Sequence, residues 1–138
     1  MSSKSPAHGL FDLTVNGQVL TLVAKGQWNL EAALDFEKEW VKLATPISNA
    51  PWAHVVFLDE WNLNTPDVEP VITAIVGWSV RHNMTHVAQI YAPSLLKKYE
   101  LDKMVGDKDL PFKKQVFLKE YEALEWLASC GFKVTDEN

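Results

Sequence analysis

The short apolar run at residues 54–58 constrains the fold of this chain more than any other feature. It contains two adjacent valines, and runs of this kind are typical of strands that are buried on both faces in a parallel sheet. Thr65 and Pro66 follow a short polar stretch, and apolar residues then recur at helical spacing as far as Asn83. The pattern predicts a central strand, a turn from Leu58 to Pro66 and a helix that packs on the sheet.

The first part of the chain predicts a β-hairpin followed by a helix. Two strand-like runs at residues 11–15 and 19–24 flank Asn16-Gly17, a pair that supplies the positive φ angles of a type I′ turn. Asn29 is a good N-cap for a helix at residues 30–44.

The remaining sequence continues to alternate strands with helices. Strands are predicted at residues 87–91 and 115–118, and helices at residues 95–104 and 120–129. Such alternation implies parallel strands that are joined by helical crossovers. The predicted fold class is therefore α/β: a single mixed, mostly parallel sheet of about five strands with an N-terminal β-hairpin and about four helices.

The length of the chain fits one domain. A chain of 138 residues is long enough to bury about 70% of its unfolded surface in a single core. Apolar residues make up 47% of it and charged residues 22%, which favours a folded domain over a disordered one. The sequence predicts a flexible N-terminal tail at residues 1–9, one domain at residues 10–133 and a flexible C-terminal tail at residues 134–138.

Charge and hydropathy exclude several classes of partner. The net charge is −5 and the sequence shows no basic cluster, since Lys97-Lys98 and Lys113-Lys114 are only pairs, whereas nucleic-acid binding needs clustered cations. The longest apolar run, residues 71–78, is far shorter than the ~20 residues that span a bilayer. The single cysteine, Cys130, cannot form an internal disulfide. These features predict a cytoplasmic protein without a nucleic-acid partner or a membrane span.

The motifs of the large enzyme classes are missing from the sequence. A phosphate-binding loop after the first strands would have only Gly26, followed by the bulky Gln27 and Trp28. There is no G-x-x-x-x-G-K-[ST] loop, no G-x-S-x-G elbow and no H-E-x-x-H helix. His82 and His86 are four residues apart, but a helix is predicted to end between them. We expect no catalytic residues, no cofactor and no metal.

Asp59 ends the predicted central strand, at the edge of an open α/β sheet where ligands usually bind. Two interpretations stay open. The carboxylate can accept backbone hydrogen bonds within its own loop, as in an Asx turn, or it can contact a ligand or a partner. A catalytic pair with His54 is disfavoured, because residues five apart on a strand point to opposite faces.

The chain has six tryptophans, a high number for its length. Four of them, Trp28, Trp52, Trp61 and Trp78, fall in or near predicted strand ends and adjoining turns. Core packing explains such residues, but tryptophan is rarely buried completely and its N–H needs a partner. Several tryptophans at one end of a sheet can instead line a pocket or form a contact surface.

Several short segments follow one another in a distinctive order after the hairpin. They are Gly26-Gln27-Trp28-Asn29, Pro51-Trp52-Ala53 before a strand that ends in Asp59, Trp61, Asn64-Thr65-Pro66, Phe117 and Glu122-Ala123-Leu124-Glu125-Trp126-Leu127. This order resembles the SpoIIAA-like branch of the STAS superfamily, relatives of the bacterial anti-sigma-factor antagonists that are sometimes grouped with Sec14-like lipid-binding domains. The resemblance extends over nearly the whole predicted domain.

In the anti-sigma-factor antagonists, a phosphorylatable Ser or Thr preceded by Asp begins the helix after such a strand. The resemblance therefore implies Thr65 as a phosphorylation candidate, where an added charge would switch partner binding. Here Asn64 replaces the Asp, and Pro66 follows directly. Thr65 as N-cap with Pro66 in the first helical position explains the same residues without phosphorylation.

The sequence predicts a non-enzymatic regulatory domain that binds a protein partner. The candidate contact residues lie at strand ends and turns: Trp28, Trp52, Asp59, Trp61, Asn64 and Thr65. The alternative is binding of a lipid or another apolar small molecule in a Trp-lined pocket, as the Sec14-like grouping implies. Self-association into a homo-oligomer also stays open.

Overall fold

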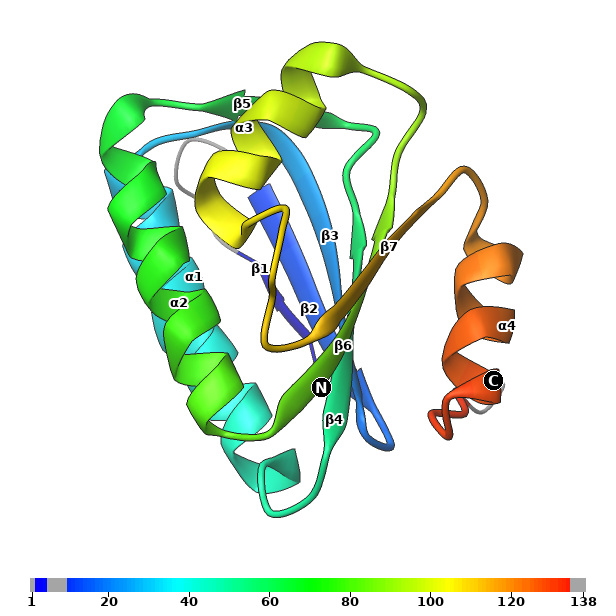
Figure 1. Ribbon diagram of the computed structural model, residues 1–138. Helices are drawn as coiled ribbons and strands as arrows, with labels where there is room; N and C mark the ends of the chain where they lie inside the picture. Colours follow the sequence, from blue (N-terminus) through cyan, green and yellow to red (C-terminus); the bar gives the residue numbers. More distant parts are fainter. Residues whose placement is uncertain (1, 5–9, 135–138) are drawn as a thin grey trace.

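The computed structural model describes residues 2–4 and 10–134 (Figure 1). Its sheet has the strand order β1-β2-β3-β4-β6-β7, with β5 paired beside the end of β3. The strands are β1 (Ser2–Lys4), β2 (Leu10–Asn16), β3 (Val19–Trp28), β4 (Trp52–Phe57), β5 (Trp61–Asn64), β6 (Met84–Ile90) and β7 (Lys113–Phe117). β1 to β3 are antiparallel and the other pairings are parallel. The predicted mixed, mostly parallel sheet is confirmed.

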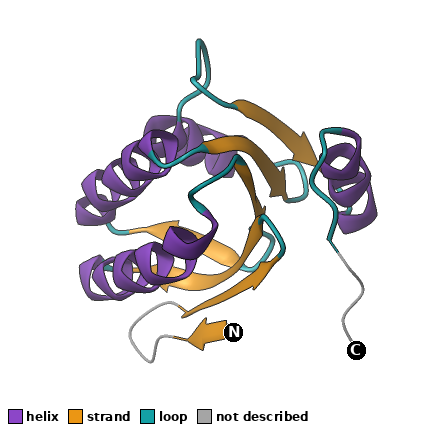
Figure 2. Cartoon of the chain, turned by 90° about the horizontal axis from the view of Figure 1, so that it is seen from below, coloured by secondary structure: helices purple, strands orange, loops and turns teal. Residues whose placement is uncertain are grey.

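Within the described residues, four α-helices cover the two faces of the sheet unequally (Figures 1 and 2). α1 (Leu30–Ala44), α2 (Glu69–Arg81) and α3 (Leu95–Val105) pack on one face, and α4 (Glu120–Ser129) packs on the other. The larger core therefore lies between the sheet and three helices.

The hairpin forms, but its turn is shifted by one residue. Asn16 still pairs with Val19, so Gly17 and Gln18 make the turn. Only Gly17 has a positive φ, of 59°, which excludes the predicted type I′ turn because that type needs two such residues. The Gln18 side chain donates hydrogen bonds to the Ile47 and Pro51 carbonyls at 2.9 and 3.0 Å, and these bonds hold the turn in its shifted register.

The segment predicted as a simple turn from Leu58 to Pro66 contains a strand. β5 pairs in parallel with the last residues of β3, through Gly26 with Trp61 and Trp28 with Asn64. A 3-10 turn at Pro66–Val68 then leads into α2. The sequence of β5 lacks the periodicity of a strand, and its pairing with β3 defines it.

β1 lies inside the segment that was predicted to be an N-terminal tail. Ser2–Lys4 pairs antiparallel with β2, from Ser2 opposite Thr14 to Lys4 opposite Asp12. The rest of that predicted tail, residues 1 and 5–9, lies outside the described residues, as do residues 135–138 of the predicted C-terminal tail. Val134 packs against the smaller core under α4.

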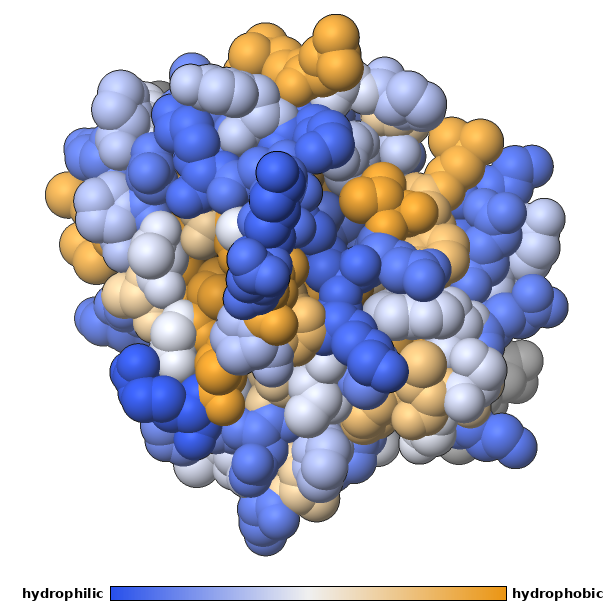
Figure 3. Space-filling model, viewed as in Figure 1, coloured by the Kyte–Doolittle hydropathy of each residue, from blue (hydrophilic) through white to orange (hydrophobic). Residues whose placement is uncertain are grey.

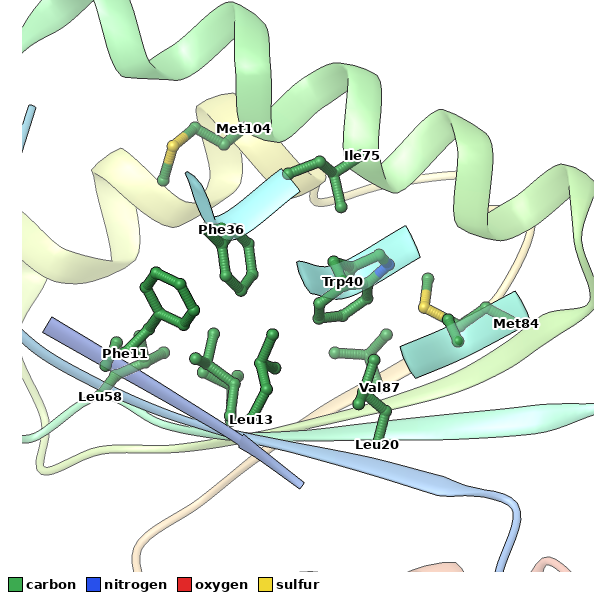
Figure 4. Close-up of a cluster of buried hydrophobic side chains, with 14 of the residues drawn as sticks. Phe11, Leu13, Leu20, Phe36, Trp40, Leu58, Ile75, Met84, Val87 and Met104 are labelled. Carbon is green, nitrogen blue, oxygen red and sulfur yellow. The ribbon is translucent and has the colours of Figure 1, made fainter. Parts of the chain in front are cut away.

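The larger core is built around aromatic rings that connect the sheet with α1. The Phe36 ring centroid lies 5.4 Å from those of Phe11 and Trp40, in the edge-to-face geometry that aromatic pairs prefer. Figure 4 shows Phe36 and Trp40 together with Ile75 from α2 and Met104 from α3, all pointing toward the sheet. Three helices thus converge on one apolar interior.

Candidate functional site

Thr65 lies where β5 ends and the chain turns toward α2. Its backbone N–H donates to the Trp28 carbonyl at 2.8 Å and fixes the turn to the end of β3. Its hydroxyl donates to Asp67 Oδ1 at 2.6 Å, and among the described residues it makes no capping bond to a helix N–H. Thr65 therefore occupies the N-cap position of the 3-10 turn, while its half-exposed hydroxyl is engaged by a carboxylate.

Asp59 is exposed and holds a neighbouring strand end. Its Oδ1 accepts a 2.7 Å hydrogen bond from the backbone N–H of Ala92, which follows β6. Lys97 of α3 donates from Nζ to the Leu58 and Asp59 carbonyls at 2.7 and 3.1 Å. The Asp59 carboxylate was expected to accept a hydrogen bond within its own loop. It accepts one from the loop after β6 instead, because parallel strands end at the same edge of the sheet. Asp59 helps to position α3.

The three candidate tryptophans are all buried. The Nε1–H of Trp28 donates to the Lys25 carbonyl at 3.2 Å, and that of Trp52 donates to the His82 carbonyl at 2.6 Å. Trp61 Nε1–H donates to Asn64 Oδ1 at 2.9 Å. None of the three rings is free to contact a partner at the surface, so the predicted contact surface cannot use them directly.

A cavity of about 100 Å³ lies inside the larger core. Among the predicted site residues, Trp28, Trp61 and Asn64 line it, and Trp52, Asp59 and Thr65 do not. Trp40 of α1 and Met104 of α3 complete part of the wall. The structure therefore contains a Trp-lined cavity, built from only half of the residues that the sequence proposed.

Two polar side chains of the cavity wall have protein partners. His54 Nδ1–H donates to the Leu20 carbonyl at 2.9 Å, and burial lowers the pKa of His54 to about 4, although this hydrogen bond acts in the opposite direction. Asn64 accepts from Trp61 and donates from Nδ2 to Met104 Sδ at 3.2 Å. The imidazole is neutral at pH 7, so the wall carries no charge at His54.

Gln89 is the third polar residue of the wall, and sequence analysis missed it. It lies in β6 opposite Val56, on the face that also carries Val87, and its exposed fraction is 2%. Its carboxamide forms no hydrogen bond with any of the described residues. The sequence held a signal for it, because a glutamine inside an otherwise apolar strand is uncommon in a core.

Exposed apolar side chains at the start of α3 were also missed. Leu95 is 89% exposed, and Leu96 and Tyr99 are exposed as well. Figure 3 shows apolar atoms gathered over this end of α3. The Lys103 ammonium lies 5.2 Å from the centre of the Tyr99 ring and 3.6 Å from Glu69 Oε1, and so connects this helix with the start of α2.

The described residues contain no group of three or more histidine, cysteine or acidic side chains that would hold a metal ion. His82 and His86 make separate contacts: the His82 ring stacks on Trp78, and the His86 ring lies against Trp126. No helix in the described part of the chain is both long and apolar enough to cross a membrane.

Comparison with known proteins gives structural similarity only. No family model and no curated protein matches the sequence. The structure is similar to an uncharacterized protein of the DUF3478 family with a SpoIIAA-like fold from Shewanella loihica PV-4, with a TM-score of 0.67 and 17% identity over 92% of this chain and 98% of that one.

Two further similar structures are those of anti-sigma factor antagonists. An anti-sigma factor antagonist from Mycobacterium paratuberculosis has a TM-score of 0.55 and 14% identity, over 91% of this chain and 99% of that one. The anti-sigma factor antagonist SpoIIAA in its unphosphorylated form has a TM-score of 0.54 and 10% identity, over 86% of this chain and 97% of that one. The resemblance inferred from the sequence is confirmed at the level of the fold, and this chain is a domain with a SpoIIAA-like fold.

Proposed function

We propose that this chain is a non-enzymatic regulatory domain that binds a protein partner at the edge formed by the Thr65 turn and the start of α3. The observation that carries the proposal is the group of exposed apolar side chains Leu95, Leu96 and Tyr99, here called the α3 cluster. Grouped apolar side chains on a surface mark interaction sites more often than single ones do.

Lys103 links the α3 cluster to Glu69, which follows Thr65 by four residues. Lys103 packs over Tyr99 and pairs with Glu69, which begins α2 directly after the 3-10 turn. Asp59 and Lys97 fix the other end of α3 to the strand ends. We propose that the surface covered by the partner extends from the cluster past Glu69 to Thr65.

The structural neighbours support a protein as the partner. Two of the three are anti-sigma factor antagonists, and the fold of this chain is similar to theirs over most of its length. Tyrosine is also enriched among the residues that contribute most to protein–protein binding, which fits a partner-contacting role for Tyr99.

Thr65 gives this surface a means of regulation. A phosphate on its hydroxyl would carry a charge of about −1.5 to −2 and would replace the 2.6 Å bond to Asp67. The phosphate and the Asp67 carboxylate would repel each other and open the turn. Phosphorylation of Thr65 would thus weaken or redirect partner binding.

The test removes the α3 cluster without disturbing the core. The double variant Leu95→Ser/Tyr99→Ser is compared with wild type and with Leu34→Ser, which changes an exposed leucine on α1. Each tagged chain is purified from its own cells, and the co-purifying proteins are quantified by mass spectrometry. We expect at least one protein whose recovery falls about tenfold or more in the double variant and stays constant in Leu34→Ser.

Equal recovery of every co-purifying protein from wild type and the double variant would contradict the proposal. A second arm uses vesicles of phosphatidylglycerol with the purified protein. Binding to these vesicles that depends on Leu95 and Tyr99, without a protein lost in the first arm, would assign the α3 cluster to lipid surfaces and overturn a protein partner.

A second candidate function is binding of an apolar small molecule inside the domain. The observation that favours it is the cavity of about 100 Å³ whose wall includes Trp28, Trp40 and Trp61. Ligand sites are typically concave and apolar, with few polar groups. Organic extraction of protein isolated from its own cells should release a small molecule in near-stoichiometric amount, and repeated extracts without one would count against this candidate.

A further inference from the structure

The volume of the cavity limits what it holds. A cavity of about 150 Å³ in another protein accommodates benzene, whereas the cavity in this core measures about 100 Å³. A phospholipid or a long acyl chain exceeds this space several times over. Met84 and Met104 in the wall are flexible enough to adapt to a small guest of about the size of one six-membered ring.

The wall is uncharged, which selects against ions. Its lining residues include no aspartate, glutamate, lysine or arginine. His54 gives its Nδ1–H to the Leu20 carbonyl, so the neutral ring leaves Nε2 as an acceptor. Burial of an unpaired carboxylate or ammonium in such a space costs far more than burial of a neutral group.

The carboxamide of Gln89 is a polar group in the cavity wall that no other described residue binds. Its side chain is 2% exposed, lines the cavity and forms no hydrogen bond with the described residues. Because this carboxamide makes no hydrogen bond within the described protein, a guest in the cavity can bond to it without displacing a protein partner. In the register of β4 and β6, Gln89 lies opposite Val56 and His54 lies opposite Val87, so the two polar side chains are diagonal neighbours on one face.

These observations point to one class of ligand. We infer that the cavity binds a small neutral molecule with an apolar body of about one ring and a single hydroxyl group that bonds to the carboxamide of Gln89. The hydroxyl both donates and accepts, which matches the donor and acceptor of a carboxamide. This inference rests on the second candidate function and narrows its ligand from apolar molecules in general to small neutral alcohols and phenols.

The experiment compares two probes that differ by one group. Phenol and toluene have nearly the same size and shape, but only phenol carries a hydroxyl. Their dissociation constants are measured by isothermal titration calorimetry on the full chain, on Gln89→Leu and on Gln115→Leu, a matched change at an exposed position. We expect the preference for phenol over toluene to fall about tenfold in Gln89→Leu and to stay unchanged in Gln115→Leu.

A measurement on the wild-type chain makes the test independent of how the variants fold. Phenol should shift the methyl NMR resonances of Met84 and Met104, which line the cavity. If neither probe binds and these resonances do not move, the second candidate function fails together with the inference. If both probes bind and Gln89→Leu leaves the ratio of their dissociation constants unchanged, the cavity is a ligand site, but the inference that Gln89 binds the hydroxyl group is overturned. Dodecanol that binds as tightly as phenol would overturn the size limit.

Discussion

At the scale of single residues, the interior is defined by polar groups that an apolar core must accommodate. His54 stays neutral and binds a backbone carbonyl, Trp61 binds Asn64, and Gln89 finds no partner among the described residues. Each lies on the face of the sheet that meets α1, α2 and α3. The sequence pattern does not predict that these side chains are buried, because their burial depends on which helices cover this face of the sheet.

His54 should make the stability of the domain depend on pH. Its pKa is about 4 in the folded chain and 6.5 in the unfolded chain, so the unfolded state takes up the proton first as the pH falls. The free energy of unfolding should therefore decrease from about pH 6.5 toward pH 4, by about 2 kcal/mol between pH 7 and pH 5. Urea denaturation at several pH values measures this loss.

The control for this prediction is His54→Gln, which keeps a side-chain donor near the Leu20 carbonyl. Burial and the nearby Lys113 also lower the pKa of the half-buried His86, which acts in the same direction. The difference between the wild type and His54→Gln isolates the buried ring. If the free energy of unfolding depends on pH identically in the two proteins, His54 is not the source of the pH dependence.

Thr65 is the residue at which charge should control partner binding. Thr65→Glu places a second carboxylate beside Asp67, whereas Thr65→Val removes the hydroxyl without adding charge. We expect Thr65→Glu to lower recovery of the partner in the co-purification experiment several-fold and Thr65→Val to have little effect. Equal recovery from both variants would show that charge at this turn has no regulatory effect.

At the scale of elements, some boundaries follow from local sequence and others do not. α1 has its predicted bounds, because Asn29 accepts a hydrogen bond from Ala32 N at its start and Pro46 lies in the 3-10 turn that follows it. β5 was missed because its four residues become a strand only by pairing with β3. The shift of the hairpin turn likewise depends on Gln18 contacts with a distant loop.

The contact between α1 and α2 includes one buried hydrogen bond. Trp40 Nε1–H donates to Ser79 Oγ at 2.8 Å, and Ser79 in turn donates to the Ile75 carbonyl. Ser79→Ala leaves the buried indole N–H without its partner and should lower the free energy of unfolding by about 1–3 kcal/mol in urea denaturation. Ser129→Ala removes an exposed hydroxyl from α4 and should change it by less than about 0.5 kcal/mol. Equal effects of the two variants would argue against this role of Ser79.

At the scale of the whole molecule, three helices on one face of the sheet create the two features on which the proposed functions rest. α2 and α3 line the cavity together with Trp28 and Trp61, and the same α3 presents Leu95 and Tyr99 at the surface. The fold class and the SpoIIAA-like resemblance followed from the sequence, because both depend on the order of elements. The cavity and the α3 cluster could not be predicted from the sequence, because both depend on how α3 packs against α2.

Native mass spectrometry of the chain, gently purified from its own cells, tests directly whether a protein partner binds at the α3 cluster. We expect a complex of this chain with a different protein chain, and the same preparation of Leu95→Ser/Tyr99→Ser should give the chain without that protein. A complex of unchanged mass and abundance in the double variant, or the absence of any complex with wild type, would contradict a protein partner at the α3 cluster.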